Sequence, residues 1–199
     1  TSFVEEVAGT LHSINPSSIL VIRSTVEIGT TDRLARELSH KVVFQPEYLG
    51  ETPQHPFLDP RMRLFVILGG EKESVMDVAD LYKTVYNADV AYHFADARTA
   101  ELCKYMENSF LAAKVILCNE FYEVAKTLGV NYNELRELWL ADPRIGRSHS
   151  DVYPDKRGFS GKCLPKDTSA LVYSAKNAGA NPELMETVIR INKEKYGNK

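Results

Sequence analysis

Residues 95–128 read ADARTAELCKYMENSFLAAKVILCNEFYEVAKTL, a stretch without proline or glycine, and Gly129 follows it. Glycine is common just past the end of a helix. Apolar residues recur at intervals of three and four through the stretch: Leu102, Met106, Phe110, Ala113, Leu117, Phe121 and Val124. This spacing predicts one helix roughly 50 Å long. Tyr105, Ala112 and Ile116 widen the apolar stripe, so we expect the helix to be covered on more than one side, by its own chain or by a partner.

Before this helix, short apolar runs alternate with helical patterns. The runs lie at 19–22, 42–44, 64–68 and 88–93, and the helical patterns at 3–12, about 30–38 and 72–86. Such alternation predicts an α/β architecture with a largely parallel sheet. The continuous run Ile19–Ile22 suits a strand covered on both faces. Thr30 or Thr31 is expected to cap the helix that ends near Leu38.

Ligands of open α/β sheets bind beyond the carboxyl ends of the strands. Thr25 and Glu47 both follow predicted strands and fall at that edge. A helix cap or a solvated acid explains either residue alone about as well. Gly69-Gly70 follows another strand, but it lacks the G-x-G-x-x-G spacing of a phosphate-binding loop, so we interpret it as a plain turn.

After the long helix the pattern is helical. A short helix is expected at 131–141, started by Asn131 or Asn133, and a last one at about 182–195. Between them lies Gly158-Phe159-Ser160-Gly161-Lys162-Cys163-Leu164-Pro165-Lys166-Asp167. Proline suits the first helical position, so this stretch predicts a helix from about Pro165 to Ala178 with Cys163 just before it. A helix N-terminus favours a thiolate, which makes Cys163 a candidate nucleophile; a buried structural cysteine is the alternative.

Glu101, Lys104 and Asn108 share one face of the long helix. A solvated face of salt bridges is the ordinary interpretation. Asn108, however, is a poor helix former and indicates a functional reason.

Composition limits the remaining classes of function. The net charge is −3 without a basic run, which argues against nucleic acid, and no apolar run approaches the ~20 residues that span a bilayer. We expect a soluble, cytoplasmic protein without a membrane partner. Three cysteines without a close pair and five scattered histidines give no support to a metal site or a disulfide framework.

Several segments in order resemble the nucleotide-sugar 6-dehydrogenase family. They are Ser24-Thr25-Val26, Gly29-Thr30-Thr31, Pro46-Glu47-Tyr48-Leu49 with Glu51, Ala100-Glu101 with Lys104-Tyr105, Asn108-Ser109-Phe110-Leu111-Ala112, Asn119-Glu120, Arg144-Ile145-Gly146 and Cys163-Leu164-Pro165-Lys166-Asp167. The resemblance covers nearly the whole chain. It implies two NAD-dependent oxidations of a sugar CH2OH to a carboxylate, through a thiohemiacetal and a thioester on Cys163.

The resemblance also implies roles for the other residues of these segments. Lys104 and Asn108 would stabilise oxyanions, Asp167 and Thr25 would hold the water that acts as base, and Glu47 would work in thioester hydrolysis. Thr25, Glu51 and Lys166 would meet the cofactor. The substrate, a UDP-sugar, would contact Glu47, Tyr48, Leu49, Lys104, Asn108, Arg144, Phe159 and Gly161, with Arg144 reaching the partner subunit's sugar site. The long helix would form a homodimer.

The family pattern further implies the second half of a doubly wound, Rossmann-like sheet (1–95, the remainder of an NAD-binding domain). An all-helical catalytic and dimerisation domain follows (96–199). The sequence starts after the family's G-x-G-x-x-G strand–helix unit and stops before its second nucleotide-binding domain, so we expect an inactive fragment. Ser160 replaces a family glycine, at a cost of about 1 kcal/mol if that position needs positive φ. The loop from Arg144 to Cys163 is also a few residues longer than usual.

The exact substrate is open. The Leu-Pro-Lys-Asp signature resembles the oxidisers of UDP-glucose and GDP-mannose more than the UDP-N-acetylmannosamine branch, and Arg144-Ile145-Gly146 favours UDP-sugars. A GDP-mannose-type enzyme and a non-catalytic oligomerisation module built on the long helix are the alternatives.

Overall fold

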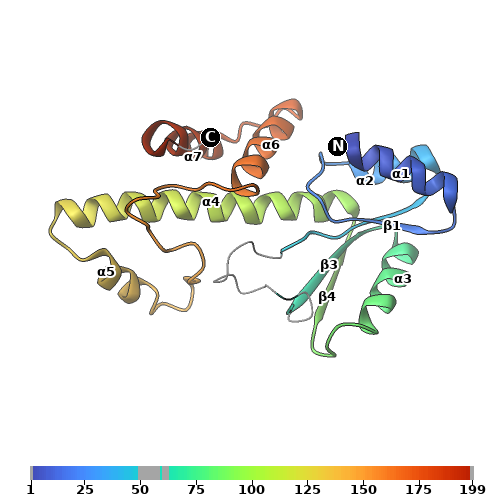
Figure 1. The fold of residues 1–199 in the computed structure, drawn as a ribbon, viewed down its shortest axis with the longest axis horizontal. Helices are drawn as coiled ribbons and strands as arrows, with labels where there is room; N and C mark the ends of the chain where they lie inside the picture. Colours follow the sequence, from blue (N-terminus) through green and yellow to red (C-terminus); the bar gives the residue numbers. More distant parts are fainter. Residues whose placement is uncertain (1, 49–58, 60–62, 198–199) are drawn as a thin grey trace. The chain divides into compact units, whose positions relative to one another are not determined.

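The computed structural model describes residues 2–48, 59 and 63–197. The chain divides into two compact units, of which the first ends at Lys104 and the second begins at Tyr105. Helix α4 (Ala97–Thr127) is continuous through this boundary, as its uninterrupted apolar periodicity predicted (Figure 1).

The first unit contains a four-stranded sheet in the order β1 (Ile19–Ile22), β2 (Lys41–Phe44), β3 (Phe65–Gly70) and β4 (Ala91–Ala95). The pairs β1–β2 and β3–β4 are parallel, as predicted, and a helix connects the strands of each pair. The pair β2–β3 is antiparallel. The sheet is therefore mixed, and the prediction of a largely parallel sheet is wrong for this pair.

Helices cover both faces of this sheet (Figure 1). On one face α1 (Ser2–Ile14) and α2 (Thr30–Leu38) pack on a cluster that includes Val42 and Phe44 of β2. On the other face α3 (Lys72–Lys83) packs on a cluster that includes Val43 of the same strand. Because neighbouring strand residues point to opposite faces, a continuous apolar run is what a strand between two helical layers needs.

The prediction that Thr30 or Thr31 caps α2 is wrong. Gly29, with φ 93°, is the N-cap residue, and both threonines lie inside the helix. The hydroxyl of Thr31 instead donates to Glu101 of α4 at 2.6 Å. The same carboxylate accepts from the backbone N–H groups of Gly29 and Thr31, so a residue of another helix takes the place of a side-chain cap.

The interpretation of Gly69-Gly70 as a turn is also wrong. Both glycines belong to β3 and pair with Phe44 and Val43 of β2. A Cβ on Gly69 would lie 2.4 Å from the Cβ of Ala100. The glycine is therefore needed because the first turn of α4 passes close to this strand.

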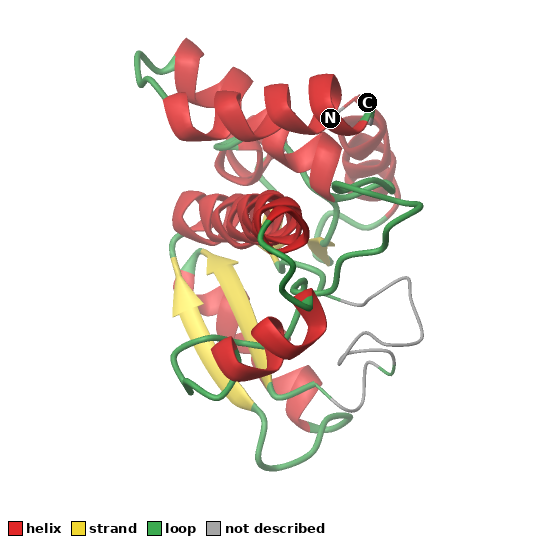
Figure 2. Cartoon of the chain, turned by 90° about the vertical axis from the view of Figure 1, so that its left-hand side faces the viewer, coloured by secondary structure: helices red, strands yellow, loops and turns green. Residues whose placement is uncertain are grey.

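The second unit is helical apart from one isolated bridge between Tyr153 and Lys156 (Figure 2). It holds α5 (Tyr132–Trp139), α6 (Leu164–Asn177), α7 (Glu183–Tyr196) and the larger part of α4. Asn131 caps α5, one of the two residues predicted to do so. A buried cluster that includes Ala112, Ile116, Phe159, Met185 and Val188 joins α4 and α7 to the loop before α6.

One stripe of α4 stays exposed. It comprises Leu102, Met106, Phe110, Leu117, Phe121, Val124 and, just past the helix, Leu128. These are most of the positions that defined the apolar periodicity, and in the part of the chain that the structure describes this side of the helix stays exposed. Within the described ranges, no helix has the length and apolar character required to cross a bilayer.

Candidate active site

Cys163 is the N-cap residue of α6, and it is exposed. Its carbonyl accepts the first hydrogen bond of the helix, from the N–H of Asp167 at 2.9 Å. The helix begins at Leu164, so Pro165 is its second residue rather than its first. N–H groups without a helical partner point toward this cap, and the positive end of the helix dipole lies there. The thiol therefore stands where a developing negative charge is favoured.

The loop before Cys163 uses two glycines in left-handed conformations, Gly158 with φ 71° and Gly161 with φ 90°. Ser160 is not among the residues with positive φ. Serine at this position therefore does not carry the free-energy cost that a positive φ would impose. Gly161 is exposed, whereas the side chain of Phe159 is buried in the cluster between α4 and α7.

Asp167 is fully buried in the first turn of α6, and two side chains donate to its carboxylate. Asn108 Nδ2 of α4 lies 2.5 Å from Oδ2, and Lys166 Nζ lies 2.6 Å from Oδ1. A buried carboxylate is costly unless its charge is balanced and its lone pairs are used. The amide and the ammonium supply both. This bond gives Asn108 a reason for its place inside a long helix.

Lys104 and Glu101 belong to the first unit, and both are buried. Lys104 Nζ donates to the carbonyl of Arg23 at 3.1 Å. Glu101 accepts hydrogen bonds from the N–H of Gly29 at 2.5 Å and the N–H of Thr31 at 2.9 Å. Burial raises the pKa of Glu101, and these donors oppose that rise. The interpretation of this helix face as a solvated row of salt bridges is therefore wrong for its first two members.

Glu47 forms ion pairs with Arg23 and with Arg63, whose Nη2 lies 3.7 Å from its Oε1. The N–H of Tyr48 donates to the same Oε1 at 2.8 Å. Thr25 is half-buried shortly after β1. Three predicted site residues, Thr25, Glu47 and Tyr48, thus follow strands that run parallel to one another, as expected for a sheet edge. Leu49 and Glu51 lie outside the described residues.

Arg144 is exposed and is held by its neighbour Asp142, whose carboxylate accepts from Arg144 Nε at 3.0 Å and Nη2 at 2.5 Å. This pairing raises the pKa of Arg144 and lowers that of Asp142. Arg144 thus lies on the surface of the second unit.

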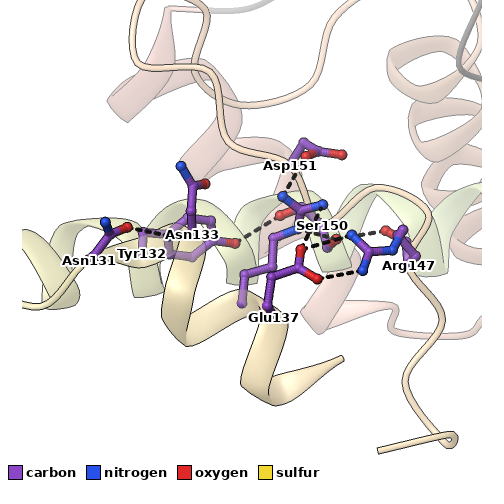
Figure 3. Close-up of polar contacts among 8 residues, drawn as sticks. Asn131, Tyr132, Asn133, Glu137, Arg147, Ser150 and Asp151 are labelled. Atoms are coloured by element: carbon purple, nitrogen blue, oxygen red, sulfur yellow. Dashed lines mark hydrogen bonds and ion pairs between the residues drawn. The ribbon is translucent and has the colours of Figure 1, made fainter. Parts of the chain in front are cut away.

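The segment after Arg144 is tied to α5 by the polar network drawn in Figure 3. Arg147 donates to both oxygens of Glu137, at 2.8 and 2.6 Å. Arg136 Nη1 lies 2.7 Å from Asp151 Oδ1, and the hydroxyl of Tyr132 donates to the carbonyl of Ser150 at 2.9 Å. The network fixes the course of the chain between α5 and the loop that leads to Cys163.

Two histidines that are distant in the sequence lie close together in the structure. The Nδ1 atoms of His12 and His40 lie 3.5 Å from each other across 28 residues. Among the described residues there is no group of three or more His, Cys, Asp or Glu side chains arranged to hold a metal ion.

Comparison with known proteins places this arrangement in a family. Residues 98–194 match the UDP-glucose/GDP-mannose dehydrogenase family, central domain. A UDP-glucose 6-dehydrogenase from Rickettsia typhi is 31% identical over 191 residues, which cover 93% of this chain and 43% of the relative. Residues 98–194 belong to the UDP-glucose/GDP-mannose dehydrogenase family as its central domain. Its stretch from Cys163 to Asp167 lies within the part that matches the family's central domain.

Two solved structures of this family are similar in fold over almost the whole chain. A UDP-glucose dehydrogenase from Pyrobaculum islandicum gives a TM-score of 0.80 at 31% identity and covers 96% of this chain and 45% of its own. A UDP-D-ManNAc dehydrogenase from Pyrococcus horikoshii gives 0.80 at 27% identity, with 96% and 46% covered. The chain spans less than half the length of each relative named here. The fold is therefore common to dehydrogenases that act on different nucleotide sugars.

Members of the UDP-glucose/GDP-mannose dehydrogenase family are NAD-dependent. The described residues do not fit the phosphates of such a dinucleotide. The sequence holds no G-x-G-x-x-G, and Gly69-Gly70 is strand backbone against which α4 packs without room for a ligand. Of the residues predicted to meet the cofactor, Lys166 is paired with Asp167, and Glu51 lies outside the described residues.

Sequence reasoning missed Asn192 of α7. Its side chain is buried, and it binds the backbone of Phe159 through two hydrogen bonds. A signal was present, because Met185, Val188 and Asn192 lie at helical spacing on one face of α7. An amide at the third position of a buried apolar face needs a partner.

Proposed function

We propose that this chain carries the catalytic thiol of a nucleotide-sugar 6-dehydrogenase that converts UDP-glucose to UDP-glucuronate. The observation that supports this most is the buried Asp167 in the first turn of the helix that Cys163 caps. Asp167 is bonded to Asn108 of α4 and to Lys166. A nucleophile, an amide donor and a charged acid–lysine pair are thus tied to one helix N-terminus.

Cys163 would attack the carbon of the sugar aldehyde to give a thiohemiacetal. Oxidation of this adduct gives a thioester, which water hydrolyses to the carboxylate and the free thiol. Covalent attachment explains how an aldehyde is kept from leaving between two oxidations. An exposed thiol at a helix N-terminus suits this role, because substrate can reach it.

Asn108 would hold the oxygen of the reacting carbon. One N–H of its amide is engaged by Asp167, which fixes the orientation of the amide plane. The second N–H on the same nitrogen is then aimed by that bond and can donate to an oxyanion. Lys104, one helical turn before Asn108 in α4, would add positive charge in this proposal.

Asp167 would hold the water that removes the proton from the sugar alcohol. Thr25 would share this role, and Glu47 would act in thioester hydrolysis, as the resemblance implies. In the same proposal the sugar nucleotide meets Tyr48, Leu49, Arg144, Phe159 and Gly161, and Thr25, Glu51 and Lys166 face the cofactor. NAD would accept the hydrides. Because the described residues form no cradle for its phosphates, no step of the proposal depends on its position.

The second candidate is a non-catalytic oligomerisation module, favoured by the exposed apolar stripe of α4. The rate of alkylation of Cys163 by iodoacetamide at neutral pH separates the two. A catalytic thiol reacts faster than Cys103, which is half-buried within α4, and equal rates would favour the module.

The complete enzyme, with the sequence that flanks this chain, provides the decisive assay. Cys163→Ser in that protein should stall before the acid is released, whereas the unchanged enzyme should produce uronic acid from UDP-glucose. Uronic acid formation at the normal rate by the variant would remove the covalent step. Faster turnover of GDP-mannose than of UDP-glucose would move the assignment to the GDP-mannose type.

We also propose that two copies of the chain pair through α4. The exposed stripe presents large apolar side chains along most of the helix, including Met106 at 73% and Phe110 at 65% exposure. The same stripe on a second copy is self-complementary about a two-fold axis, which is the usual symmetry of homodimers. Pairing would remove from water an apolar surface that the chain's own residues leave open.

A further inference from the structure

One side chain of α7 binds both polar groups of the Phe159 backbone. The N–H of Phe159 donates to Asn192 Oδ1 at 2.8 Å, and Asn192 Nδ2 donates to the carbonyl of Phe159 at 2.9 Å. Both residues are buried. This pair of bonds fixes which end of the amide is oxygen and which is nitrogen. At neutral pH a primary amide offers such a spaced donor and acceptor, whereas a carboxylate or an ammonium does not.

Packing alone does not account for an amide at this position. Asn192 follows Met185 and Val188 on the buried face of α7, where an apolar side chain would fill the space. A buried amide that lacks partners costs free energy, and this one meets its requirement through the backbone of Phe159. The amide of Asn192 therefore serves to bind the backbone of the loop and not to pack α7.

The residues just before Phe159 are also anchored, in this case to α4. Asn119 Oδ1 accepts from Arg157 Nε at 2.6 Å and from the N–H of Gly158 at 3.2 Å. The backbone is thus fastened at 158 and 159. The next three residues, 160–162, are exposed, and Cys163 follows at the start of α6.

We propose that Asn192 is a positioning residue for Cys163. Three exposed residues, 160–162, separate Cys163 from the backbone of Phe159 that Asn192 holds. Because this span is short, the position of Phe159 limits where the N-terminus of α6 can lie. If the anchor is lost, the loop can move and Cys163 can leave the end of the helix dipole. This inference rests on the proposed function of Cys163 as the nucleophile.

The test uses the 199-residue chain with Asn192→Ala and, in case the cavity impairs folding, with Asn192→Leu, which keeps the branched shape of the side chain without its polar atoms. Two measurements are made. Peptide mapping gives the rate at which iodoacetamide alkylates Cys163 at pH 7, separately from Cys103. Hydrogen exchange followed by NMR gives the protection of the amides of Gly158 and Asp167, which Asn192 does not touch.

Met185→Ala is the matched control, because Met185 is buried on the same face of α7 and in the same cluster as Phe159, but its side chain has no amide to bond the loop backbone. We expect both Asn192 variants to alkylate at Cys163 about tenfold more slowly and to lose protection at both amides. The control should stay within about twofold of the unchanged chain on both measurements.

Two results would overturn the inference: Asn192 variants that behave as the unchanged chain does, or a Met185→Ala chain that changes as much as they do. If Cys163 of the unchanged chain reacts no faster than Cys103, the proposed function fails instead. The exchange comparison then still decides whether Asn192 fixes the loop.

Discussion

Asn108 Nδ2 and Asp167 Oδ2 lie 2.5 Å apart and join two helices whose sequences are 59 residues apart. The acceptor is fully buried and the donor half-buried. The bond explains an asparagine in the interior of α4 and gives the buried carboxylate in the first turn of α6 a neutral donor. Most of the proposed chemistry of the second unit depends on this contact.

Replacing Asn108 by alanine should destabilise the chain by about 1–3 kcal/mol, because the buried carboxylate of Asp167 loses a donor. Urea denaturation gives the free energy of unfolding. Asn177→Ala, at the exposed last residue of α6, is the control and should change it by less than about 0.5 kcal/mol. Equal effects of the two substitutions would show that the contact between Asn108 and Asp167 adds no stability.

Gly69→Ala should destabilise the first unit by about 1–3 kcal/mol, because its Cβ would meet Ala100 Cβ at 2.4 Å and the carbonyl of Asp96 at 2.9 Å. Gly9→Ala in α1 has open space around the new Cβ and should stabilise by about 0.5–1 kcal/mol. Thermal unfolding of the two variants should therefore shift in opposite directions. A Gly69→Ala chain as stable as the original would mean that α4 does not pass this close to β3.

Arg147 lowers the pKa of Glu137 through its two hydrogen bonds. The folded chain thus holds this carboxylate ionised at a lower pH than the unfolded chain, whose glutamates titrate near about 4.3. The stabilisation is present above that pH and is lost as the pH falls through the folded pKa. Glu137→Gln should therefore lower the Tm at pH 7 and leave it unchanged near pH 3.

The control for this prediction is the same substitution in an Arg147→Met background. There, Glu137→Gln should cause a much smaller pH-dependent loss of Tm, because only Arg136, whose Nη2 lies 3.6 Å from Glu137 Oε1, still favours the ionised carboxylate. If the full loss persists without Arg147, the ion pair between Arg147 and Glu137 in Figure 3 is not its source.

Phe110→Glu should convert the proposed dimer into a monomer, because it places a charge in the centre of the apolar stripe of α4. Light scattering after size-exclusion chromatography gives the mass at a fixed protein concentration. Leu184→Glu is matched to it, since Leu184 is 69% exposed on α7. The dimer proposal requires that Leu184→Glu keep the mass of the original chain, and a monomeric original chain would contradict it.

The elements of this fold were largely predictable because they depend on local periodicity. The predicted strand at 19–22 matches β1, and the helix predicted over 95–128 is α4, shorter by two residues at its start and one at its end. The strand predicted at 88–93 is β4, which spans 91–95. Apolar content alone does not determine where a strand begins and ends. The place of Cys163 just before a helix was also predicted, since proline and glycine mark helix starts and loops, whereas its exposure was left open by the sequence.

The sequence by itself determined the order of strands and helices, the long helix with its apolar stripe, and the candidate residues, because spacing along the chain reports periodicity. Tertiary structure alone decided which distant groups meet: Asn108 with Asp167, Glu101 with Thr31 across 70 residues, and Asn192 with the backbone of Phe159. It also decided the antiparallel pairing of β2 with β3. A buried polar group needs a partner, but local sequence does not say which one, since that choice depends on how whole elements pack.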